Sequence, residues 1–271
     1  MDLSAIPVPE ADKRTTPKLS PEEIRSMPVQ ISVVPIGFVP PPIIKLDASG
    51  MPREQYRDPL EYPPTSYHFA TQHGTIRMVG AQNQLTSPTA VPRRNELAFS
   101  YELPPSQNAV PTGDKKRLKS IGSFNVPAGA THLVVVLWKD PADRLWSDPQ
   151  FKVIDVSPGA VKAHEAIVIN GSGRELAIER GDKPYKIVSG FIGKIALPVN
   201  AQGEVPMYVS ASTGVGWHRL SSSVLGPGKD ERIFVIAWQT PQSAAQPTGV
   251  SLQAAARRLP QAKPFEPQKE G

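Results

Sequence analysis

The chain has 271 residues, of which 31 are proline and none is cysteine, and its net charge is +5. Because proline fixes φ and interrupts helices, this composition argues against a mostly helical protein. The lack of cysteine excludes disulfides, thiolate metal sites and a cysteine nucleophile. The charge is mild for this length, so we expect no nucleic-acid partner.

The prolines divide the chain into a centre and two ends. Thirteen of them lie in residues 1–64 and five lie in residues 241–271. The sequence therefore predicts a proline-rich N-terminal arm over 1–64 and a short C-terminal tail over 241–271. Between them we expect two β-sandwich domains, at 65–148 and 149–240.

The N-terminal arm combines one short helix with an apolar stretch. Ser20 as N-cap, Pro21 at the first helical position and Glu23 at N3 predict a helix near 21–27. The residues that follow are too apolar for a disordered linker. We therefore expect the arm to pack on its own domains or on a neighbouring copy, through Val33, Ile36, Phe38, Val39, Ile43 and Ile44.

The central residues favour strands throughout. Leu97, Phe99, Tyr101 and Leu103 alternate with smaller or polar residues, which is typical of a half-buried strand. Turn residues recur every 8–12 positions, and the region is about twice the ~100 residues of one immunoglobulin-like sandwich. The predicted fold class is therefore all-β, with two tandem immunoglobulin-like β-sandwich domains.

Three runs are apolar at every position, at residues 133–138, 166–169 and 233–238. Such runs predict central strands that are buried on both faces. The first and third runs both follow a glycine-containing turn and both end in tryptophan, which supports a tandem repeat. At the C-terminus, apolar residues at helical spacing predict a further helix over 250–259, ended by Pro260.

Three motifs follow the first apolar run: Leu-Trp-Ser-Asp-Pro at 145–149, Ile-Asn-Gly-Ser-Gly-Arg-Glu-Leu-Ala-Ile at 169–178 and Gly-Asp at 181–182. With these motifs, residues 133–197 resemble a poorly characterised bacterial family of the Verrucomicrobia type. The resemblance implies a β-sandwich protein, often exported, with no assigned reaction. Members of this family usually begin with a signal sequence, and the first residues given, Met-Asp-Leu-Ser-Ala-Ile-Pro, do not predict one.

A search for catalytic and metal-binding motifs finds none. The five histidines do not pair at i, i+2 or i, i+4, and His164-Glu165 lacks the second histidine of a zinc-protease helix. The chain contains no phosphate-binding loop, dinucleotide fingerprint or nucleophile elbow. We therefore expect no cofactor, no metal and no catalytic residues.

Two of the four tryptophans lie in turn-rich segments. Trp146 and Trp217 are expected to be exposed there and to form candidate ligand aromatics, because such rings stack on sugars or anchor interfaces. Trp138 and Trp238 end apolar runs and are expected in the core.

The favoured function is a non-enzymatic assembly subunit that associates with itself through its N-terminal arm and C-terminal tail. Such a subunit would belong to a surface filament, a surface layer or a virus-like shell. A carbohydrate- or cell-surface-ligand-binding module, with a polysaccharide as partner, is the alternative, and a hydrolase is the third. No run reaches the ~18 apolar residues of a membrane span. An extracellular or cell-surface location is expected if a signal peptide was removed, and otherwise a cytoplasmic or virion location.

Overall fold

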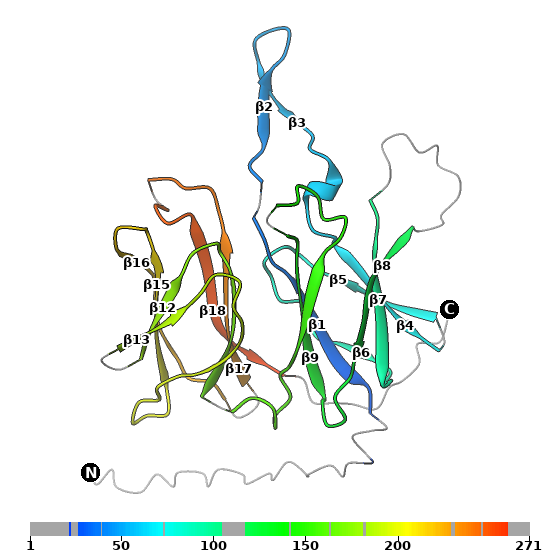
Figure 1. Ribbon diagram of the computed structural model, residues 1–271, viewed down its shortest axis with the longest axis vertical. Helices are drawn as coiled ribbons and strands as arrows, with labels where there is room; N and C mark the ends of the chain where they lie inside the picture. The colour runs from blue at the N-terminus through cyan, green and yellow to red at the C-terminus, as the bar shows by residue number, and fades with distance from the viewer. Residues whose placement is uncertain are drawn as a thin grey trace, which may run out of the picture.

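The computed structural model of the chain is shown in Figure 1. It describes residues 22, 27–38, 40–72, 74–104, 117–140, 142–162, 164–180, 183–228, 231–244 and 246–259. The fold is all-β, as the sequence predicts, with 54% strand and 2% helix. The helix predicted near 21–27 lies almost entirely outside the described residues.

The N-terminal half forms a sandwich of two four-stranded sheets, ordered β10-β9-β1-β6 and β5-β4-β7-β8. Four aromatic side chains at most 2% exposed fill its core: Tyr67, Phe69, Phe99 and Tyr101. The strands are β1 (Val29–Pro35), β4 (Ser66–Thr71), β5 (Gly74–Val79), β6 (Thr89–Val91), β7 (Glu96–Glu102), β8 (Leu118–Asn125), β9 (His132–Trp138) and β10 (Gln150–Asp155).

The C-terminal half forms a second sandwich with sheets ordered β14-β11-β17-β18 and β13-β12-β15-β16. Its core is aliphatic, with Leu176, Ile178, Met207 and Val209 fully buried. The strands are β11 (Glu165–Gly171), β12 (Leu176–Arg180), β13 (Lys183–Ile187), β14 (Ile192–Ala196), β15 (Val205–Ser212), β16 (Trp217–Leu225), β17 (Glu231–Gln239) and β18 (Val250–Arg258).

The two sandwiches repeat one strand plan. In each, the first strand pairs parallel to the seventh, β1 with β9 and β11 with β17. Each also has one bulge at the same place, between Phe99 and Ser100 in β7 and between Val209 and Ser210 in β15. The first repeat differs by an inserted hairpin of β2 (Ile43–Leu46) and β3 (Pro52–Gln55), followed by the 3-10 helix η1 (Pro59–Glu61). The immunoglobulin-like topology itself stays a prediction.

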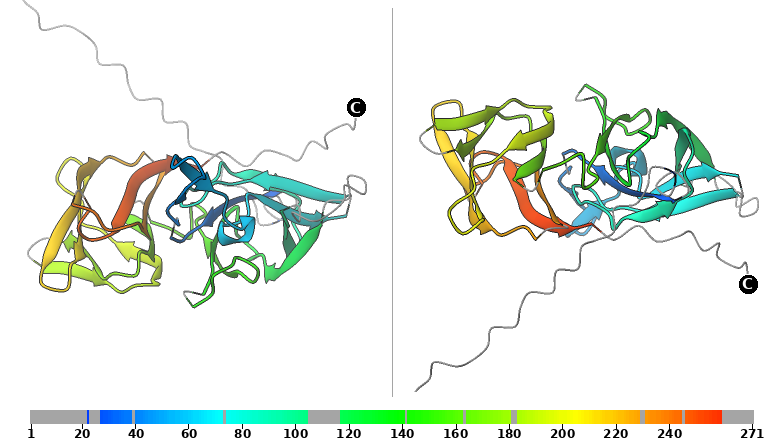
Figure 2. Two further views of the ribbon diagram at one scale, coloured as in Figure 1. Left: turned by 90° about the horizontal axis from the view of Figure 1, so that it is seen from above. Right: turned by 90° about the horizontal axis from the view of Figure 1, so that it is seen from below.

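The two repeats pack against each other through the sheets that contain β1 and β11. Val34 and Val134 of the first sheet and Ile169 and Phe234 of the second belong to one buried apolar cluster. Figure 2 shows the two halves of the chain side by side across the molecule. This interface explains why β9, β11 and β17 are apolar at nearly every position, because each strand has a sandwich core on one face and the other repeat on the opposite face.

The structure moves the predicted domain boundaries. Val29–Pro35 is not part of an arm, since β1 is a fully buried central strand. Gln150–Asp155 belongs to the first sandwich, because β10 pairs antiparallel with β9 over its whole length. The boundary near 148 therefore falls too early, and the second repeat begins with β11 at Glu165. The polar turns at 140–149 lie within the first repeat.

The helix predicted over 250–259 is wrong, because Val250–Arg258 forms strand β18. The strand pairs with β17 over nine residues. Val250, Leu252 and Ala254 pack on the second core. These positions also alternate with a period of two, so the segment satisfies both patterns. Its helix-favouring alanines are overridden by pairing with a central strand that has no other neighbour on that side.

Candidate functional site

The predicted arm residues divide between the first sandwich and the inserted hairpin. Val33 is fully buried in the core of the first sandwich, and Ile36 is 3% exposed between the two repeats. Both are therefore unavailable to a second copy, contrary to the prediction. Phe38 and Ile43 are half-buried, whereas Ile44 is 57% exposed. Val39 lies outside the described residues.

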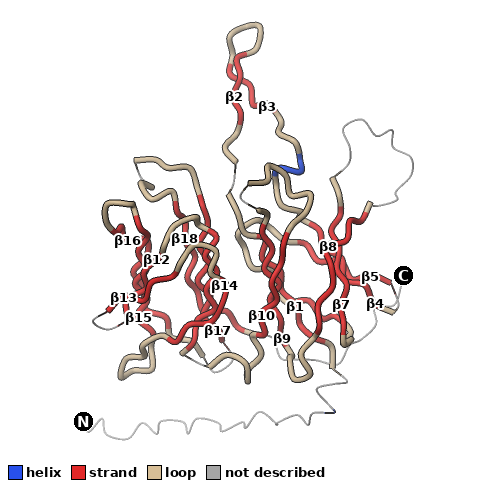
Figure 3. The backbone as a smooth tube through the Cα atoms, in the orientation of Figure 1, coloured by secondary structure: helices blue, strands red, loops and turns tan. Residues whose placement is uncertain are grey.

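The inserted hairpin projects beyond the ends of both sandwiches, as the backbone traces in Figures 1 and 3 show. Large apolar side chains are concentrated on it and on its return to the body. Leu46 is 71% exposed, Met51 is 60% exposed and Tyr56 is 93% exposed, in addition to Ile44. Because buried apolar area is worth roughly 25 cal/mol per Å², these side chains favour contact with another surface.

The alternation of the strands gives the hairpin two different faces. Ile44 lies opposite Glu54, and Leu46 lies opposite Pro52, so these four residues share one face. Ile43, Lys45, Arg53 and Gln55 form the other. Neither face is covered by a second sheet. The hairpin therefore presents a mainly apolar face and a mainly polar face.

A single carboxylate organises the tip. Asp47 Oδ1 accepts hydrogen bonds from the Ser49 amide at 2.9 Å, the Ser49 hydroxyl at 2.5 Å and the Met51 amide at 3.0 Å. Its Oδ2 accepts from Arg53 Nε at 3.0 Å. The Ser49 hydroxyl and the Arg53 guanidinium lower the pKa of Asp47 to about 2. Gly50 completes the turn with φ of +78°, which glycine adopts without strain.

A second carboxylate fixes the base. Glu61 is 6% exposed and lies between two arginines, with Arg144 Nη2 at 2.6 Å from Oε1 and Arg57 Nη1 at 2.7 Å from Oε2. Arg57 also donates to the Pro41 carbonyl at 2.9 Å, which ties the outgoing strand to the incoming one. The hydrogen bonds from Arg144 and Arg57 hold the pKa of Glu61 below its usual value. The hairpin is therefore held at both ends.

No strand of the described residues pairs with the outer edge of β2. The Asp47 amide donates to the Met51 carbonyl at 2.9 Å, so this pair is hydrogen-bonded. Hydrogen-bonded pairs alternate along an antiparallel ladder, which places the backbone groups of Ile44 and Leu46 on the side away from β3. Their N–H and C=O groups are available to another strand.

The two candidate ligand aromatics lie in different repeats and differ in exposure. Trp146 is 1% exposed within the first core, so its predicted exposure is wrong. Its backbone N–H donates to the Leu60 carbonyl at 2.6 Å, so the residue lies beside η1. Trp217 is 45% exposed on β16, with Lys186 Nζ 5.6 Å from the ring centroid. The two rings do not form one binding platform.

Sequence reasoning missed Leu46, Met51 and Tyr56. The available signal was the turn-forming stretch 47–50 between two short extended segments, which predicts a hairpin. Among the described residues, no group of three or more histidine, aspartate or glutamate side chains is placed to hold a metal ion. Within the same residues, no helix has the length and apolar character needed to cross a membrane.

Comparison with known proteins adds no relative. No protein-family model matches the sequence, and no curated protein matches it. The resemblance of residues 133–197 to a Verrucomicrobia-type family therefore stays a prediction.

Proposed function

We propose that the protein is a non-enzymatic assembly subunit whose β2–β3 hairpin pairs with the same hairpin of a second copy. One observation carries this proposal: an apolar face is displayed on a hairpin that is fixed at its tip by Asp47 and at its base by Glu61. A fixed element loses little conformational entropy on binding, which favours association.

The open edge of β2 supports a second copy as the partner. An isolated two-stranded hairpin is only marginally stable in water, and three or more strands are needed for independent stability. Pairing two hairpins through β2 gives one four-stranded sheet. The same edge then serves both partners, as a two-fold interface requires.

The side chains favour one register. Centring the two-fold axis on Ile44 places Ile44 opposite its own copy and Lys45 opposite Ile43, so no two lysines face each other. Leu46 then lies opposite Pro42, whose carbonyl accepts the Leu46 N–H and whose missing N–H ends the ladder. Ile44 and Leu46 of both copies form one continuous apolar face.

A two-fold contact of this kind closes on itself, so it produces a dimer. A filament, a layer or a shell requires a second, different contact. The assembly proposed here is therefore the pairing step, and any larger structure would be built from that dimer.

The absence of cysteine allows a direct test. In the proposed register the two Ile44 Cα atoms lie about 5.5 Å apart, which is within the range of a disulfide. Ile44→Cys is expected to give a covalent dimer, of twice 29.4 kDa, under mild oxidation. Val215→Cys is the matched control, because Val215 is 99% exposed but lies on the second repeat.

Two outcomes contradict the proposal. One is a wild-type protein that stays monomeric by light scattering at high protein concentration. The other is cross-linking of Ile44→Cys no faster than that of Val215→Cys. If the proposal is correct, Leu46→Lys removes the dimer while leaving the circular dichroism spectrum unchanged, because Leu46 is 71% exposed and contributes little to the fold.

A further inference from the structure

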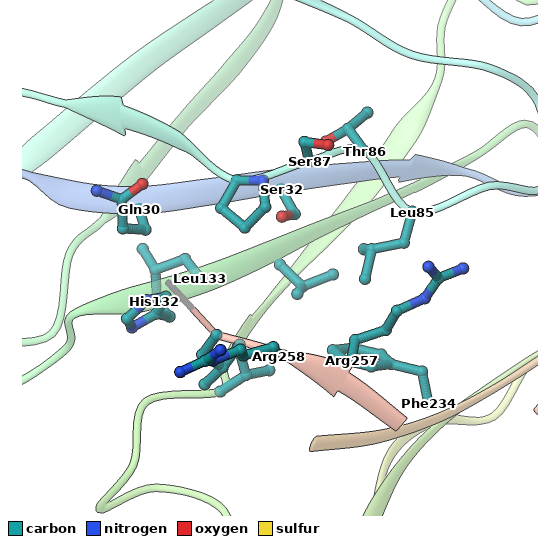
Figure 4. Close-up of a pocket in the computed structure, with 14 residues that line it drawn as sticks. Gln30, Ser32, Leu85, Thr86, Ser87, His132, Leu133, Phe234, Arg257 and Arg258 are labelled. Carbon is teal, nitrogen blue, oxygen red and sulfur yellow. The ribbon is translucent and has the colours of Figure 1, made fainter. Parts of the chain in front are cut away.

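A pocket of about 250 Å³ lies between the two repeats, where β1 and β9 begin and β18 ends. Figure 4 shows Gln30, Ser32 and Ser87 along one wall, with His132 and the two arginines of β18 along the other. The pocket is away from the hairpin, so it is independent of the proposed pairing.

The first wall carries two polar side chains, those of Gln30 and Ser32, that stabilise the fold through no hydrogen bond to the described residues. Gln30 is 8% exposed and Ser32 is 4% exposed. Neither side chain forms a hydrogen bond with any of the described residues, although both line the pocket. Their polar atoms are not fully enclosed by the protein, so they can form hydrogen bonds with a molecule in the pocket.

The repeat shows that a polar residue is not required at this place by the fold. Ser32 pairs with Val134 in β1 and β9, and Ile167 pairs with Phe234 at the equivalent place in β11 and β17. Ile167 is fully buried in the interface between the repeats. An apolar residue therefore suits this position, and Ser32 leaves space and a hydroxyl where the second repeat has a butyl group.

The second wall is cationic. Arg257 and Arg258 line the pocket and form no ion pair or hydrogen bond with the described residues. No carboxylate belongs to the pocket lining. Across the strand pair, Arg257 lies directly opposite Arg232, where like charges repel, whereas Arg258 lies opposite Glu231. Positive charge is therefore gathered here without an acidic lining residue.

Apolar side chains form the floor of the pocket. Val134, Val156, Phe234 and Leu259 contribute to it, and each is at most 8% exposed. Arg257 and Arg258 are successive residues of β18, so their guanidinium groups leave the strand toward opposite faces and border the pocket separately. An apolar floor with a few amide, hydroxyl and guanidinium groups is typical of small-molecule sites. Guanidinium groups match the geometry of a carboxylate or a phosphate.

We propose that this pocket binds a small organic anion, with its oxyanion group at one of the two arginines of β18 and an apolar body on the floor formed by Val134 and Phe234. The side chains of Gln30 and Ser32 provide the remaining hydrogen bonds. The volume accommodates a molecule of about the size of benzoate, and no covalent step is involved.

The test uses the full chain and three probes in a low-chloride buffer: benzoate, the neutral isostere benzamide, and inorganic phosphate. Titration calorimetry and thermal unfolding should show binding of benzoate, with weaker binding of phosphate and none of benzamide. Either Arg257→Gln or Arg258→Gln should weaken benzoate binding at least tenfold, and the anion contact is contradicted if neither does. Arg219→Gln, on the outer face of the second sandwich, is the control and should have no effect.

The variant Ser32→Ile tests whether Ser32 serves ligand binding or is merely a poorly packed position in the interface between the repeats. It copies the residue of the second repeat, so the variant should fold and unfold at the same or a higher temperature while losing the response to benzoate. Ser222→Ile, on the exposed strand β16, should keep it. The site is overturned if no probe binds to the wild type, or if Ser32→Ile folds and still binds benzoate. The apolar body is overturned if phosphate binds as tightly as benzoate.

Discussion

Ile36 and Gly171 occupy equivalent positions in the two repeats and pack directly against each other. Ile36 follows Pro35, which pairs with Leu137, and Gly171 follows Asn170, which pairs with Ala237. Leu137 and Ala237 are the residues before the tryptophans that end β9 and β17, so the two positions correspond. A Cβ atom added at Gly171 would lie 2.5 Å from Ile36 Cγ1. One repeat therefore supplies a large side chain where the other supplies none. The interface is asymmetric at its centre, and two copies of the first repeat would not fit together in this way.

Gly171→Ala should destabilise the protein by about 1–3 kcal/mol, because the added methyl group overpacks a buried contact. Urea unfolding measures the change. Gly159→Ala is the control, since a Cβ at Gly159 meets no atom within 4 Å. Combining Gly171→Ala with Ile36→Ala should restore part of the loss. Additive effects in the double variant would show that these two residues do not interact.

The tip of the hairpin should respond to pH through Asp47. The pKa of Asp47 is lowered in the folded state, from 3.8 to about 2, by the Ser49 hydroxyl and Arg53. Its contribution is therefore present above pH 3.8 and is lost as the pH falls toward 2. Amide proton shifts of Ser49 and Met51 in NMR spectra should follow a midpoint near 2, and Asp47→Asn should abolish this titration. A midpoint at the ordinary value would contradict the hydrogen bonds at the tip.

Glu61 should control how firmly the hairpin is attached. Glu61→Gln removes the charge shared by Arg57 and Arg144, leaving two cations beside a buried amide. We expect faster cleavage by trypsin after Arg53 and Arg57 and a lower melting temperature. Glu54→Gln is the matched control, because Glu54 is exposed and lies on the hairpin itself. Equal cleavage rates for both variants would argue against the attachment at the base.

Local patterns predicted the strands well where burial alone determines them. The apolar runs at 133–138 and 233–238 became β9 and β17, and the shared turn before each indicated the repeat correctly. The alternation at 97–103 became β7. In each case both faces of the strand have a fixed environment, so the pattern of apolar residues is nearly sufficient.

Long-range pairing accounts for the errors. Nothing near Val29–Pro35 indicates that β1 inserts beside β9, about 100 residues later in the chain. β18 has the alanines and arginines of a helix but completes a sheet beside β17. These partners are set by sheet topology, which residue patterns within a segment do not contain. The proline-rich composition of residues 1–64 likewise gives no sign of the central strand that lies within them.

The candidate site was predicted only in part. Ile43 and Ile44 are predicted interface residues because they are apolar in a proline-rich segment; Ile43 is half-buried and Ile44 is exposed, and their role in an interface stays a prediction. Val33 and Ile36 have the same character but are buried by the fold. Composition alone does not distinguish an exposed apolar residue from one that the fold buries. The register of the hairpin, which places Leu46 beside Ile44, separates them.

The two tryptophans should give opposite results when they are truncated. Trp146→Ala should cost about 3–5 kcal/mol in urea unfolding, because the ring is fully enclosed in the first core. Trp217→Ala should change stability by less than about 1 kcal/mol, since the main interaction lost is the exposed contact with Lys186. Iodide should quench the fluorescence of Trp217 and not that of Trp146. If the protein instead acts on carbohydrate, Trp217→Ala is the variant that should lose glycan binding, whereas Trp146 is too deeply buried to take part.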